Sequence, residues 1–336
     1  MKKTVFFFVL FFLSGRFLFS QEEPILLSGN AQGTTYHITY FDKQNRDFQV
    51  EIEKILQAFD KSVSTYLPTS IISRINSNQK NVIVDDYFIA CFKKAKEVWK
   101  NTDGAFDPTV YPLVNAWGFG PGKKQTIEKS KIDSMLKFVG FDLIELKGKT
   151  IVKRDLRVSL DFNAFAQGYS VDVVSEFLDS KKITSYLVEI GGEVYAKGKK
   201  PDGENWKVGI EKPIENKDSK NPLKAIAKLE NMAIATSGNY HKFIVIDGVK
   251  YAHHIDPKTG YPTKNNLLSA SLFSKTCISS DANATGVFVM GLEKAKEFLK
   301  VHTELQAYLI YSDEQGNYRV YETPGLNSIV SDAEEE

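Results

Sequence analysis

The sequence predicts an α+β fold in which mixed or antiparallel sheets are flanked by helices. Apolar residues at helical spacing dominate the first third of the chain, short apolar runs typical of strands dominate the rest, and the two do not alternate strictly. Strict alternation would instead favour a doubly wound parallel sheet. With 336 residues, 42% of them hydrophobic and 25% charged, the chain can form one large or two ordinary domains.

Residues 1–20 predict a secretory signal peptide. Two lysines precede an apolar run, Thr4 to Leu13, that is too short for a standard membrane-spanning helix. We expect cleavage near Ser20, although Arg16 and the bulky residues after it leave an uncleaved anchor as the alternative. The protein is therefore expected to be exported to the periplasm, either free or held at the inner membrane by its leader. It is not expected to be a lipoprotein, because no cysteine lies near this end.

The net charge and the two cysteines indicate which partners and which cross-links to expect. Without the three basic residues of the leader, 40 basic side chains face 42 acidic ones, a net charge of −2. This balance gives no basic field for a nucleic acid, and we expect no nucleic-acid partner. Export would permit a disulfide between Cys91 and Cys277, but both lie in apolar patterns and are interpreted as buried free thiols.

The expected elements follow from periodicity. A strand at 34–41 precedes helices at 48–63 and 86–100, a turn-rich segment at 104–122 and a short helix at about 130–138. We interpret the apolar stripes of both longer helices as core packing. A helix at 166–180 and a helical stretch at 280–300 interrupt the later strands, which we expect at 143–153, 157–160, 185–190, 193–198, 206–211, 224–236, 242–254, 267–275, 306–311 and 317–322. Residues 21–330 would form one domain, with two α/β subdomains as the alternative, and residues 331–336 a disordered acidic tail.

Asp281 and Thr285 form the first of three polar motifs in the last third of the chain. They are four residues apart, which on a helix places both side chains on one face. If Ser279 or Ser280 caps this helix, Asp281 falls in its first turn, where an acid has an ordinary role opposite the helix dipole. The alternative is a magnesium site, because Mg²⁺ prefers oxygen ligands and needs only one or two protein carboxylates beside ligand phosphates.

His253 and His254 follow an apparent strand and precede the turn 256–260. Adjacent strand residues point to opposite faces, so we expect at most one imidazole to face a given site. One interpretation is a half-exposed histidine pair beside a plain turn. The other is a general base, since imidazole titrates near working pH.

Three further segments carry weaker signals. Thr236 to Tyr240 is either a hairpin turn or a cradle of hydroxyl and N–H donors. Asn163, in the segment 161–169, could cap the following helix, whose N-terminus could alternatively face a phosphate. Gly191-Gly192 marks a tight turn or a close backbone approach. The sequence contains no phosphate loop, no dinucleotide fingerprint and no zinc-ligand spacing.

Taken together, these segments resemble the FAD:protein FMN transferase (ApbE) family. The matching segments run in the family's order over about residues 28–325, and their ordered conjunction is far more specific than any one of them: Gly33–Tyr36, Ser64–Tyr66, Gly104–Thr109, Leu113–Gly120, Asp161–Asp172, Ile190–Gly192, Thr236–Gly238, His253–Pro262 and Asp281–Gly286. The resemblance implies an ApbE-like, T-fold-like architecture.

The resemblance also implies roles for individual residues. Asp281 and Thr285 would bind Mg²⁺ through their side chains and Ala164 through its main-chain carbonyl, and His253 would be the base. The residues lining the FAD site would be Gln32, Tyr66, Ala105, Phe106, Asp107, Gln167, Ser237 and His253. Family members commonly differ at four positions, with Met at Gln32, Lys or Glu at Gln167, Arg at His241 and sometimes an acid at Ala284. Loss of a second acid at Ala284 would weaken the metal site.

The activity implied by the resemblance is Mg²⁺-dependent transfer of the FMN half of FAD onto a threonine or serine of an acceptor protein, with release of AMP. The implied acceptor belongs to a membrane redox complex and carries an Asp/Ser-Gly-Ala-Thr/Ser-like sequence. Two alternatives remain at this stage. Water could be the acceptor, which would make the enzyme an FAD pyrophosphatase, or the protein could be a non-enzymatic periplasmic FAD carrier. An intact Asp281, Thr285 and His253 set favours an enzyme, because binding alone needs no base.

Overall fold

The computed structural model describes residues 23–121, 128–213, 223–239, 243–246 and 249–333. The predicted leader at 1–20 lies outside these residues, as do His241 and the last three glutamates. Within the described part of the chain, no helix is both long and apolar enough to cross a membrane.

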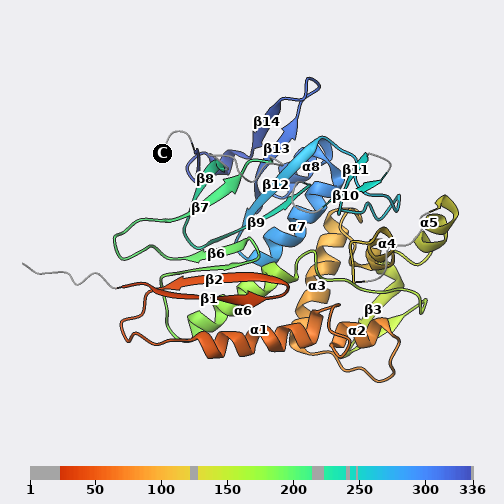
Figure 1. Cartoon of the computed structure of the whole chain (residues 1–336), viewed down its shortest axis with the longest axis horizontal. Coiled ribbons are helices and arrows are strands. Elements are labelled where there is room, and N and C mark those ends of the chain that lie inside the picture. Colours follow the sequence, from red (N-terminus) through yellow and green to blue (C-terminus); the bar gives the residue numbers. More distant parts are fainter. Residues whose placement is uncertain (1–22, 122–127, 214–222, 240–242, 247–248, 334–336) are drawn as a thin grey trace, which may run out of the picture.

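An eight-stranded sheet forms the centre of the molecule (Figure 1). Every neighbouring pair in it is antiparallel, so the expectation of mixed or antiparallel sheets is confirmed in its antiparallel form. In spatial order its strands are β1 (Ile25–Ala31), β2 (Thr34–Tyr40), β5 (Tyr186–Ile190), β6 (Glu193–Lys197), β9 (Met232–Gly238), β12 (Leu267–Ser274), β13 (Gln306–Ser312) and β14 (Tyr318–Glu322).

Helices cover one face of this sheet and a small sheet covers the other. Helix α6 (Ala166–Ser180) packs on β5 and β6, α7 (Cys277–Met290) on β9 and β12, and α8 (Leu292–Val301) on β13. The opposite face packs against the three-stranded sheet of β7 (Trp206–Glu211), β8 (Leu223–Leu229) and β15 (Val330–Asp332). The pair β10 (Phe243–Ile246) and β11 (Val249–Ala252) forms a separate hairpin.

The segment between β2 and α6 adds a second layer of packing on α7. It contains α1 (Gln49–Val63), α2 (Ile71–Asn76), α3 (Asp86–Asn101), the 3₁₀ turn η1 (Pro108–Val110), α4 (Tyr111–Trp117), α5 (Lys129–Leu136), η2 (Phe141–Leu143) and the hairpin of β3 (Ile144–Lys147) and β4 (Thr150–Lys153). Its core includes Phe88, Phe92 and Phe162, and two residues of α7, Ile278 and Ala282, belong to the same cluster. Figure 1 shows α3 beside α7.

Helix α7 is buried on nearly all sides. Its residues belong to three hydrophobic clusters: Ile278 and Ala282 face the α3 layer, Cys277 faces the cluster below β2 and β5, and the helix C-terminal half packs with β12, α8 and β13. A helix that is apolar all round is the expected sequence for such a position. The polar residues that α7 does carry, among them Asp281 and Thr285, are therefore exceptions that need partners.

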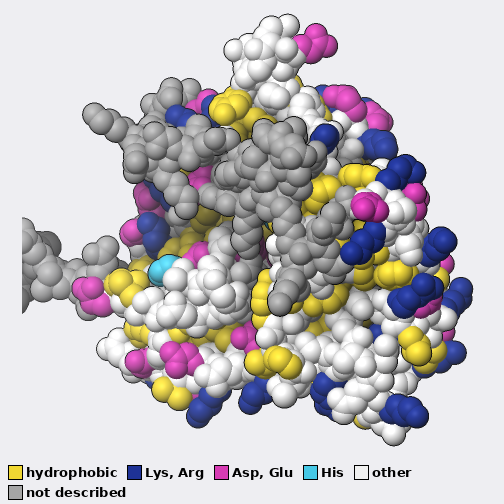
Figure 2. Space-filling model, turned by 45° about the vertical axis from the view of Figure 1, so that its right-hand side comes forward, with side chains coloured by type: hydrophobic (Ala, Val, Ile, Leu, Met, Phe, Trp, Pro, Cys, Tyr) yellow, Lys and Arg dark blue, Asp and Glu magenta, His cyan; other side chains and the backbone are white. Residues whose placement is uncertain are grey.

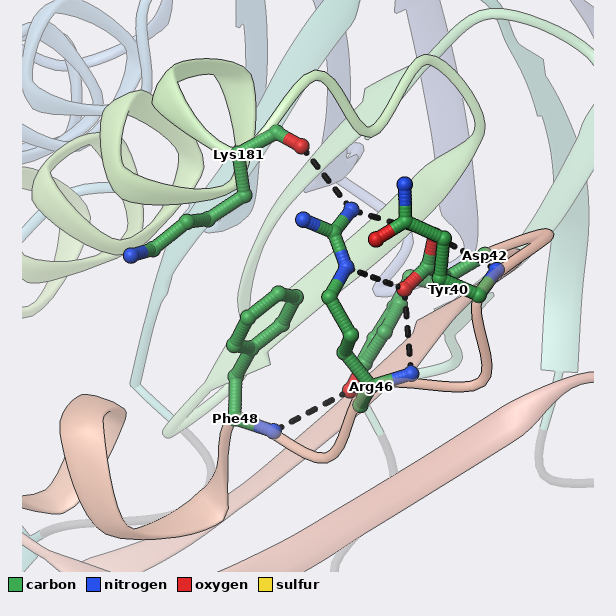
Figure 3. A network of polar contacts seen from close by, with 6 residues as sticks. Tyr40, Asp42, Arg46, Phe48 and Lys181 are labelled. Atoms are coloured by element: carbon green, nitrogen blue, oxygen red, sulfur yellow. Dashed lines mark hydrogen bonds and ion pairs between the residues drawn. The ribbon is translucent and has the colours of Figure 1, made fainter.

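A salt-bridged corner lies where β2, next to the edge strand β1, leads into α1 (Figure 3). The carboxylate of Asp42 accepts bonds from Nε and Nη2 of Arg46 at 2.7 and 3.1 Å and from the Arg46 backbone N–H at 3.0 Å. Arg46 also donates to the carbonyl of Lys181 at 3.0 Å, and Tyr40 donates to the carbonyl of Arg46 at 2.6 Å. The network ties the start of α1 to the end of α6.

Most expected elements are confirmed, and the differences have local causes. The expected strand at 224–236 is two strands, because Asn231 between them has a φ of +51°. The stretch 280–300 is likewise two helices, separated by Gly291 with a φ of +75°. The expected strands 143–153 and 242–254 are each a short hairpin, while β1, α2 and the helical turns within 104–122 were not predicted.

The expected strand at 157–160 is wrong. Val158 and Leu160 are buried, as their apolar character suggested, but no strand pairs with them in the described part of the chain. Instead the side-chain amide of Asn76 accepts from the Leu160 N–H and donates to the Leu160 carbonyl, both at 2.8 Å. One side chain thus supplies the hydrogen bonds that a neighbouring strand would give.

Two other expectations concern the C-terminal tail and the cysteines. Ser331 and Asp332 lie in β15 and pair with β8, and Asp332 forms an ion pair with Lys224 at 2.9 Å, so the tail is ordered further than expected. Cys91 and Cys277 are both buried and free, which confirms the interpretation as unpaired thiols.

Candidate functional site

Two of the three predicted metal-site residues meet where α7 crosses the start of α6, and the third lies one turn away. The Thr285 hydroxyl donates to the Ala164 carbonyl at 3.2 Å. One turn back along α7, the Asp281 carboxylate accepts the Gly168 backbone N–H at 2.9 Å. Ser237, at the end of β9, places its Oγ 3.3 Å from Thr285 Oγ1. The four-residue spacing seen in the sequence therefore brings these oxygens to one edge of α7.

Asp281 does not have the ordinary first-turn role that its sequence position allowed. The helix begins at Cys277 with Thr276 as its N-cap, so Asp281 lies in the second turn and is only 7% exposed. Burial raises its pKa to about 8, with the nearby Asp172 carboxyl acting in the same direction and the Gly168 N–H bond opposing it. Among the described residues, no lysine, arginine or histidine forms an ion pair with Asp281.

The segment at Ser237 is also different from expectation. Thr236 to Gly238 form the end of β9 and pair with β12, rather than making a hairpin turn, and neither Gly238 nor Asn239 has a positive φ. Alternation along β9 places Ser237 on the same sheet face as Ala233, toward the helices, and Thr236 on the opposite face, where its hydroxyl meets Ser271 at 2.7 Å. Strand geometry therefore aims the Ser237 hydroxyl at α7.

The donor set at this crossing fits a magnesium ion. It consists only of oxygens: a carboxylate, two hydroxyls and a main-chain carbonyl. The buried carboxyl of Asp281 has no cationic side chain paired with it in the described part of the chain, and a bound cation would supply a positive charge. No group of three or more His, Cys, Asp or Glu side chains able to hold a metal occurs in the described residues. The set therefore matches an ion that completes its shell with ligand phosphates and water, rather than an all-protein cage.

Gln32 and Gln167 lie together at the start of α6. Ser170 links them, donating to the Gln167 carbonyl at 2.7 Å and contacting Gln32 Oε1 at 3.3 Å. Gln32 occupies the β1–β2 turn with a φ of +54°, and its buried Nε2 has no hydrogen-bond partner among the described residues. The Gln167 amide covers Gly191, where a Cβ would lie 2.7 Å from Nε2, so the Gly191-Gly192 turn is a close backbone approach.

The segment Ala105 to Asp107 can reach a ligand mainly through its backbone. Phe106 is buried against Phe165, with ring centroids 5.5 Å apart. The Asp107 carboxylate accepts from the N–H and hydroxyl of Thr109 at 2.8 and 2.6 Å and from the Phe141 N–H at 3.1 Å. Burial raises the Asp107 pKa to about 6, which these bonds partly oppose. Ala105 lines a cavity of about 880 Å³ between α3, α7, α8 and the loop 256–265.

Tyr66 and Asp161 lie near one another but differ in burial. The Tyr66 side chain is 62% exposed and available for stacking, whereas the Asp161 carboxyl is buried and burial raises its pKa to about 6. Asp161 accepts the Asn163 N–H at 2.9 Å, and the Asn163 amide donates to Thr65 at 3.0 Å. Asn163 therefore does not cap α6, whose N-cap is Phe165 without a side-chain bond.

His253 lies beyond the end of β11, and this changes the expected orientation of the histidine pair. Because the strand ends at Ala252, the His253 and His254 rings do not point to opposite faces; their centroids are 3.9 Å apart. His254 is buried and packs on Phe288 of α7 at 4.4 Å, and His253 lies 6.3 Å from the Phe119 ring. The pair is thus attached to the same helix that carries Asp281 and Thr285, through His254.

Figure 2 shows the side of the molecule that is on the right in Figure 1. On this face the lysine and arginine side chains are interspersed with acidic and uncharged ones.

Comparison with protein families shows which family this chain belongs to. The model of the ApbE family matches residues 32–309. This chain belongs to the ApbE family. It is 38% identical to the FAD:protein FMN transferase of Haemophilus influenzae, over 88% of this chain and 89% of that protein. It is 33% identical to the FAD:protein FMN transferase of Vibrio cholerae, over 92% and 93% of the two chains.

Solved structures of ApbE proteins share this fold. The flavin transferase ApbE from Vibrio cholerae matches with a TM-score of 0.83 at 32% identity, covering 92% of this chain and 99% of that one. The apo form of Pseudomonas stutzeri flavinyl transferase ApbE matches with a TM-score of 0.81 at 30% identity, covering 92% and 97%. The predicted ApbE-like α+β architecture is therefore confirmed.

Two residues at the crossing of this ApbE-family chain were not singled out from sequence. Asp172 is an acid flanked by valines on a buried helix, and that contrast was the available signal. Gly168 leaves no room for a side chain, since a Cβ there would lie 2.6 Å from Asp281 Cβ and from the Cys277 carbonyl. At Ala284, the methyl group is buried in the cluster beneath β12.

Proposed function

We propose that this chain is a Mg²⁺-dependent FAD:protein FMN transferase, which attaches FMN through a phosphoester bond to a threonine or serine of an acceptor protein. The observation that carries the proposal is the convergence of the Ala164 carbonyl with the Thr285 and Ser237 hydroxyls, one turn from the Asp281 carboxylate. The relatives from Haemophilus influenzae and Vibrio cholerae are FAD:protein FMN transferases, which supports the same reaction.

The transfer replaces the phosphoanhydride bond of FAD with a phosphoester bond to the acceptor. The acceptor hydroxyl oxygen bonds to the phosphorus of the FMN half, and the bond from that phosphorus to the oxygen bridging to AMP breaks, so that AMP leaves with the electron pair. His253 accepts the proton of the attacking hydroxyl. Asp281, Thr285 and Ala164 would hold Mg²⁺, which would supply positive charge to offset that of the FAD phosphates.

The remaining site residues position the dinucleotide. Tyr66 offers an exposed ring, while Phe106 and Asp107 contribute through their backbone, because their side chains are engaged within the fold. Gln32 and Gln167 supply amide groups at the start of α6. Ala105 and Ser237 complete the set of FAD contacts. Positioning of this kind contributes by holding the phosphorus in line with the attacking oxygen.

The site of action follows from the leader. A signal peptide at 1–20 would place the enzyme in the periplasm, either free or held at the inner membrane. The acceptor would then be an exported domain of a membrane redox complex that carries an Asp/Ser-Gly-Ala-Thr/Ser-like sequence. Expression of the full chain followed by cell fractionation and mass determination of its N-terminus tests this: a cytoplasmic protein that begins at Met1 would contradict it.

One gel experiment tests the activity. The protein is incubated with FAD, Mg²⁺ and an acceptor domain bearing the sequence above, and the denatured acceptor is inspected for flavin fluorescence while AMP is measured. A fluorescent acceptor band with one AMP released per flavin is the expected result. AMP without labelled acceptor would indicate a pyrophosphatase, and the absence of both products would indicate a carrier.

The role of His253 has its own test. His253→Ala should lower the rate of transfer by about a hundredfold, because a positioned base contributes that order of acceleration, while FAD affinity stays near the wild-type value. Stopped-flow measurement of AMP release and fluorescence titration of FAD separate the two quantities. If His253→Ala instead loses FAD binding, the residue is a ligand contact and not the base.

A further inference from the structure

The helices α6 and α7 cap each other. The Asp172 carboxylate of α6 accepts the backbone N–H groups of Cys277 and Ile278, the first two residues of α7, at 2.7 and 2.8 Å. In return, the Asp281 carboxylate of α7 accepts the N–H of Gly168, the third residue of α6, at 2.9 Å. Neither helix has a side-chain cap from its own N-cap residue, so each depends on the other for these donors.

The contacts between the two helices form a regular ladder. Asp172, Gly168 and Ala164 are spaced by four residues, and their partners Cys277, Asp281 and Thr285 are spaced by four as well. Because one set of numbers falls as the other rises, the helices run in opposite directions, and each contact lies one turn from the next. A shift of α7 along α6 would break all three contacts together.

Two features keep the ladder in register. Gly168 allows the backbones to approach closely, since a Cβ would lie 2.6 Å from Asp281 Cβ. Asp172 lies at the far end from Thr285, is only 9% exposed and binds two donors with its two oxygens. Charge-assisted bonds from backbone N–H groups to a buried carboxylate are among the stronger and more directional ones in a protein.

We propose that Asp172 is a positioning residue for the magnesium site. It touches neither the ion nor FAD; it fixes the first turn of α7 against α6 and thereby sets where Asp281 and Thr285 lie relative to the Ala164 carbonyl. The inference rests on the proposed function, because it concerns the metal set assigned there. Asp172 lies outside the metal set, but it would determine the distances between the ligand oxygens that an octahedral ion requires.

The test measures metal binding directly. Asp172→Ala removes both acceptors, whereas Asp172→Asn keeps one of the two. Mn²⁺ serves as the probe, and its dissociation constant is measured by electron paramagnetic resonance on FAD-saturated protein. We expect Asp172→Ala to weaken Mn²⁺ binding by about tenfold or more, which is the range for residues that orient metal ligands. Asp172→Asn keeps one acceptor and should weaken binding less, by roughly threefold. FAD affinity measured without metal should change less than about twofold.

Asp42→Ala is the matched control. Asp42 is also a buried carboxylate that accepts two backbone N–H groups, those of Gln44 and Arg46, but it lies at the salt-bridged corner in Figure 3. Its loss should lower the melting temperature and leave the Mn²⁺ dissociation constant within about twofold of wild type. A purely structural role for Asp172 would give the same pattern in Asp172→Ala.

The outcomes separate this inference from the proposed function. Wild-type Mn²⁺ affinity in folded Asp172→Ala overturns the positioning role alone, as does an equal loss of Mn²⁺ affinity in Asp172→Ala and Asp42→Ala. If Asp172→Ala does not fold, Asp172→Asn decides in the same way. If the wild-type protein binds FAD but no Mn²⁺, the metal assignment of the proposed function falls and the inference falls with it.

Discussion

Two buried aspartates show how differently this fold treats the same side chain. Asp42 and Asp281 are each 7% exposed. Asp42 is paired with Arg46, whose hydrogen bonds hold its pKa below the usual range, whereas burial raises the pKa of Asp281 to about 8. Burial alone therefore does not distinguish a structural acid from a functional one. The difference is the cation: Arg46 supplies one at the corner of β2 and α1, whereas no cationic side chain among the residues that the structure describes is paired with Asp281.

The environment of Asp281 is unfavourable for an ionised carboxylate when no cation is bound. An acid removed from water without a counter-charge destabilises its own ionised form until a cation arrives. The Gly168 N–H gives only partial compensation, and the Asp172 carboxyl nearby increases the penalty. A site of this kind has a greater affinity for a bound ion than a neutralised corner such as Asp42–Arg46.

Asp281→Asn should produce the largest effect. The substitution keeps an acceptor for the Gly168 N–H but removes the only carboxylate of the proposed metal set, and transfer should fall by about a thousandfold or more, equivalent to several kcal/mol. The melting temperature of the metal-free protein should stay the same or rise, because an unpaired buried acid has been removed. AMP release and calorimetry measure the two quantities. Full activity of Asp281→Asn would mean that Asp281 is not a metal ligand. A large loss of stability would mean that Asp281 has a structural role like that of Asp42.

Gly168→Ala tests the close approach at the crossing. The new methyl group would lie 2.6 Å from both Asp281 Cβ and the Cys277 carbonyl, so the helices must separate. Overpacking of this type should lower the free energy of unfolding by roughly 1–3 kcal/mol. Denaturant unfolding measures the loss. Gly203→Ala is a control of the opposite kind, since a Cβ there meets no atom within 4 Å but its φ of +85° strains any side chain.

An unchanged free energy of unfolding in Gly168→Ala would mean that the helices do not approach as closely as the structure shows, because Gly168 has no positive φ that a side chain would strain.

The two regions should also respond to pH in opposite directions. The folded-state pKa values of Asp172 and Asp281, raised mainly by burial to about 7 and about 8, exceed the value of about 3.9 for an unfolded aspartate. Their contribution to stability is therefore complete below about pH 4 and is lost as the pH rises through 7 and 8. Asp42 has a lowered pKa, so its contribution is present above about pH 4 and is lost on acidification.

In EDTA, the melting temperature should therefore fall between about pH 4 and pH 8, with a loss on the order of several kcal/mol. Saturating Mg²⁺ and FAD should reduce this loss, since a bound cation favours the ionised form of Asp281. Calorimetry across pH, with Asp42→Asn as the control that keeps the alkaline slope, measures the effect. A flat profile over this range would mean that neither acid is desolvated as the fold suggests.

Asp42→Ala should have the smallest effect on function and a moderate effect on stability. It removes bonds to the Arg46 side chain and backbone, but the Arg46 side chain is 34% exposed and can be hydrated. A loss of about 1–2 kcal/mol follows, measured by denaturant unfolding, with transfer unchanged in the gel assay. Loss of transfer without loss of stability would mean that the salt-bridged corner affects the α6–α7 crossing, through Lys181 and α6.

Periodicity predicted the elements that bury one clear face, such as α1, α3, α6 and β5 to β7. It failed where burial was weak or where hydrogen bonds came from unexpected groups. Strand β1 buries only one residue, Leu27, and contains Ser28, Gly29 and Asn30, so its pattern resembles a loop. Val158 and Leu160 are as buried as strand residues, but a side-chain amide from α2 replaces the partner strand.

The candidate site shows the same limit. The spacing of Asp281 and Thr285 predicted a shared face, and family resemblance supplied Ala164 as their neighbour. The role of Asp172 could not follow from local sequence, because its partners lie more than a hundred residues away. The orientation of His253 was also wrong, since it depended on where β11 ended, and single residues at element boundaries decide side-chain direction.

Helix α7 belongs to three separate hydrophobic clusters, and this has a consequence for selectivity. The helix cannot tilt or slide by a fraction of an ångström without disturbing packing on three sides, and close-packed interiors resist such adjustment. Asp281 and Thr285 are therefore held on a rigid helix. In the proposed metal site, an ion of the wrong radius would meet oxygens that do not move to fit it, so the rigidity of α7 would contribute, together with the ligands, to discrimination between small and large cations.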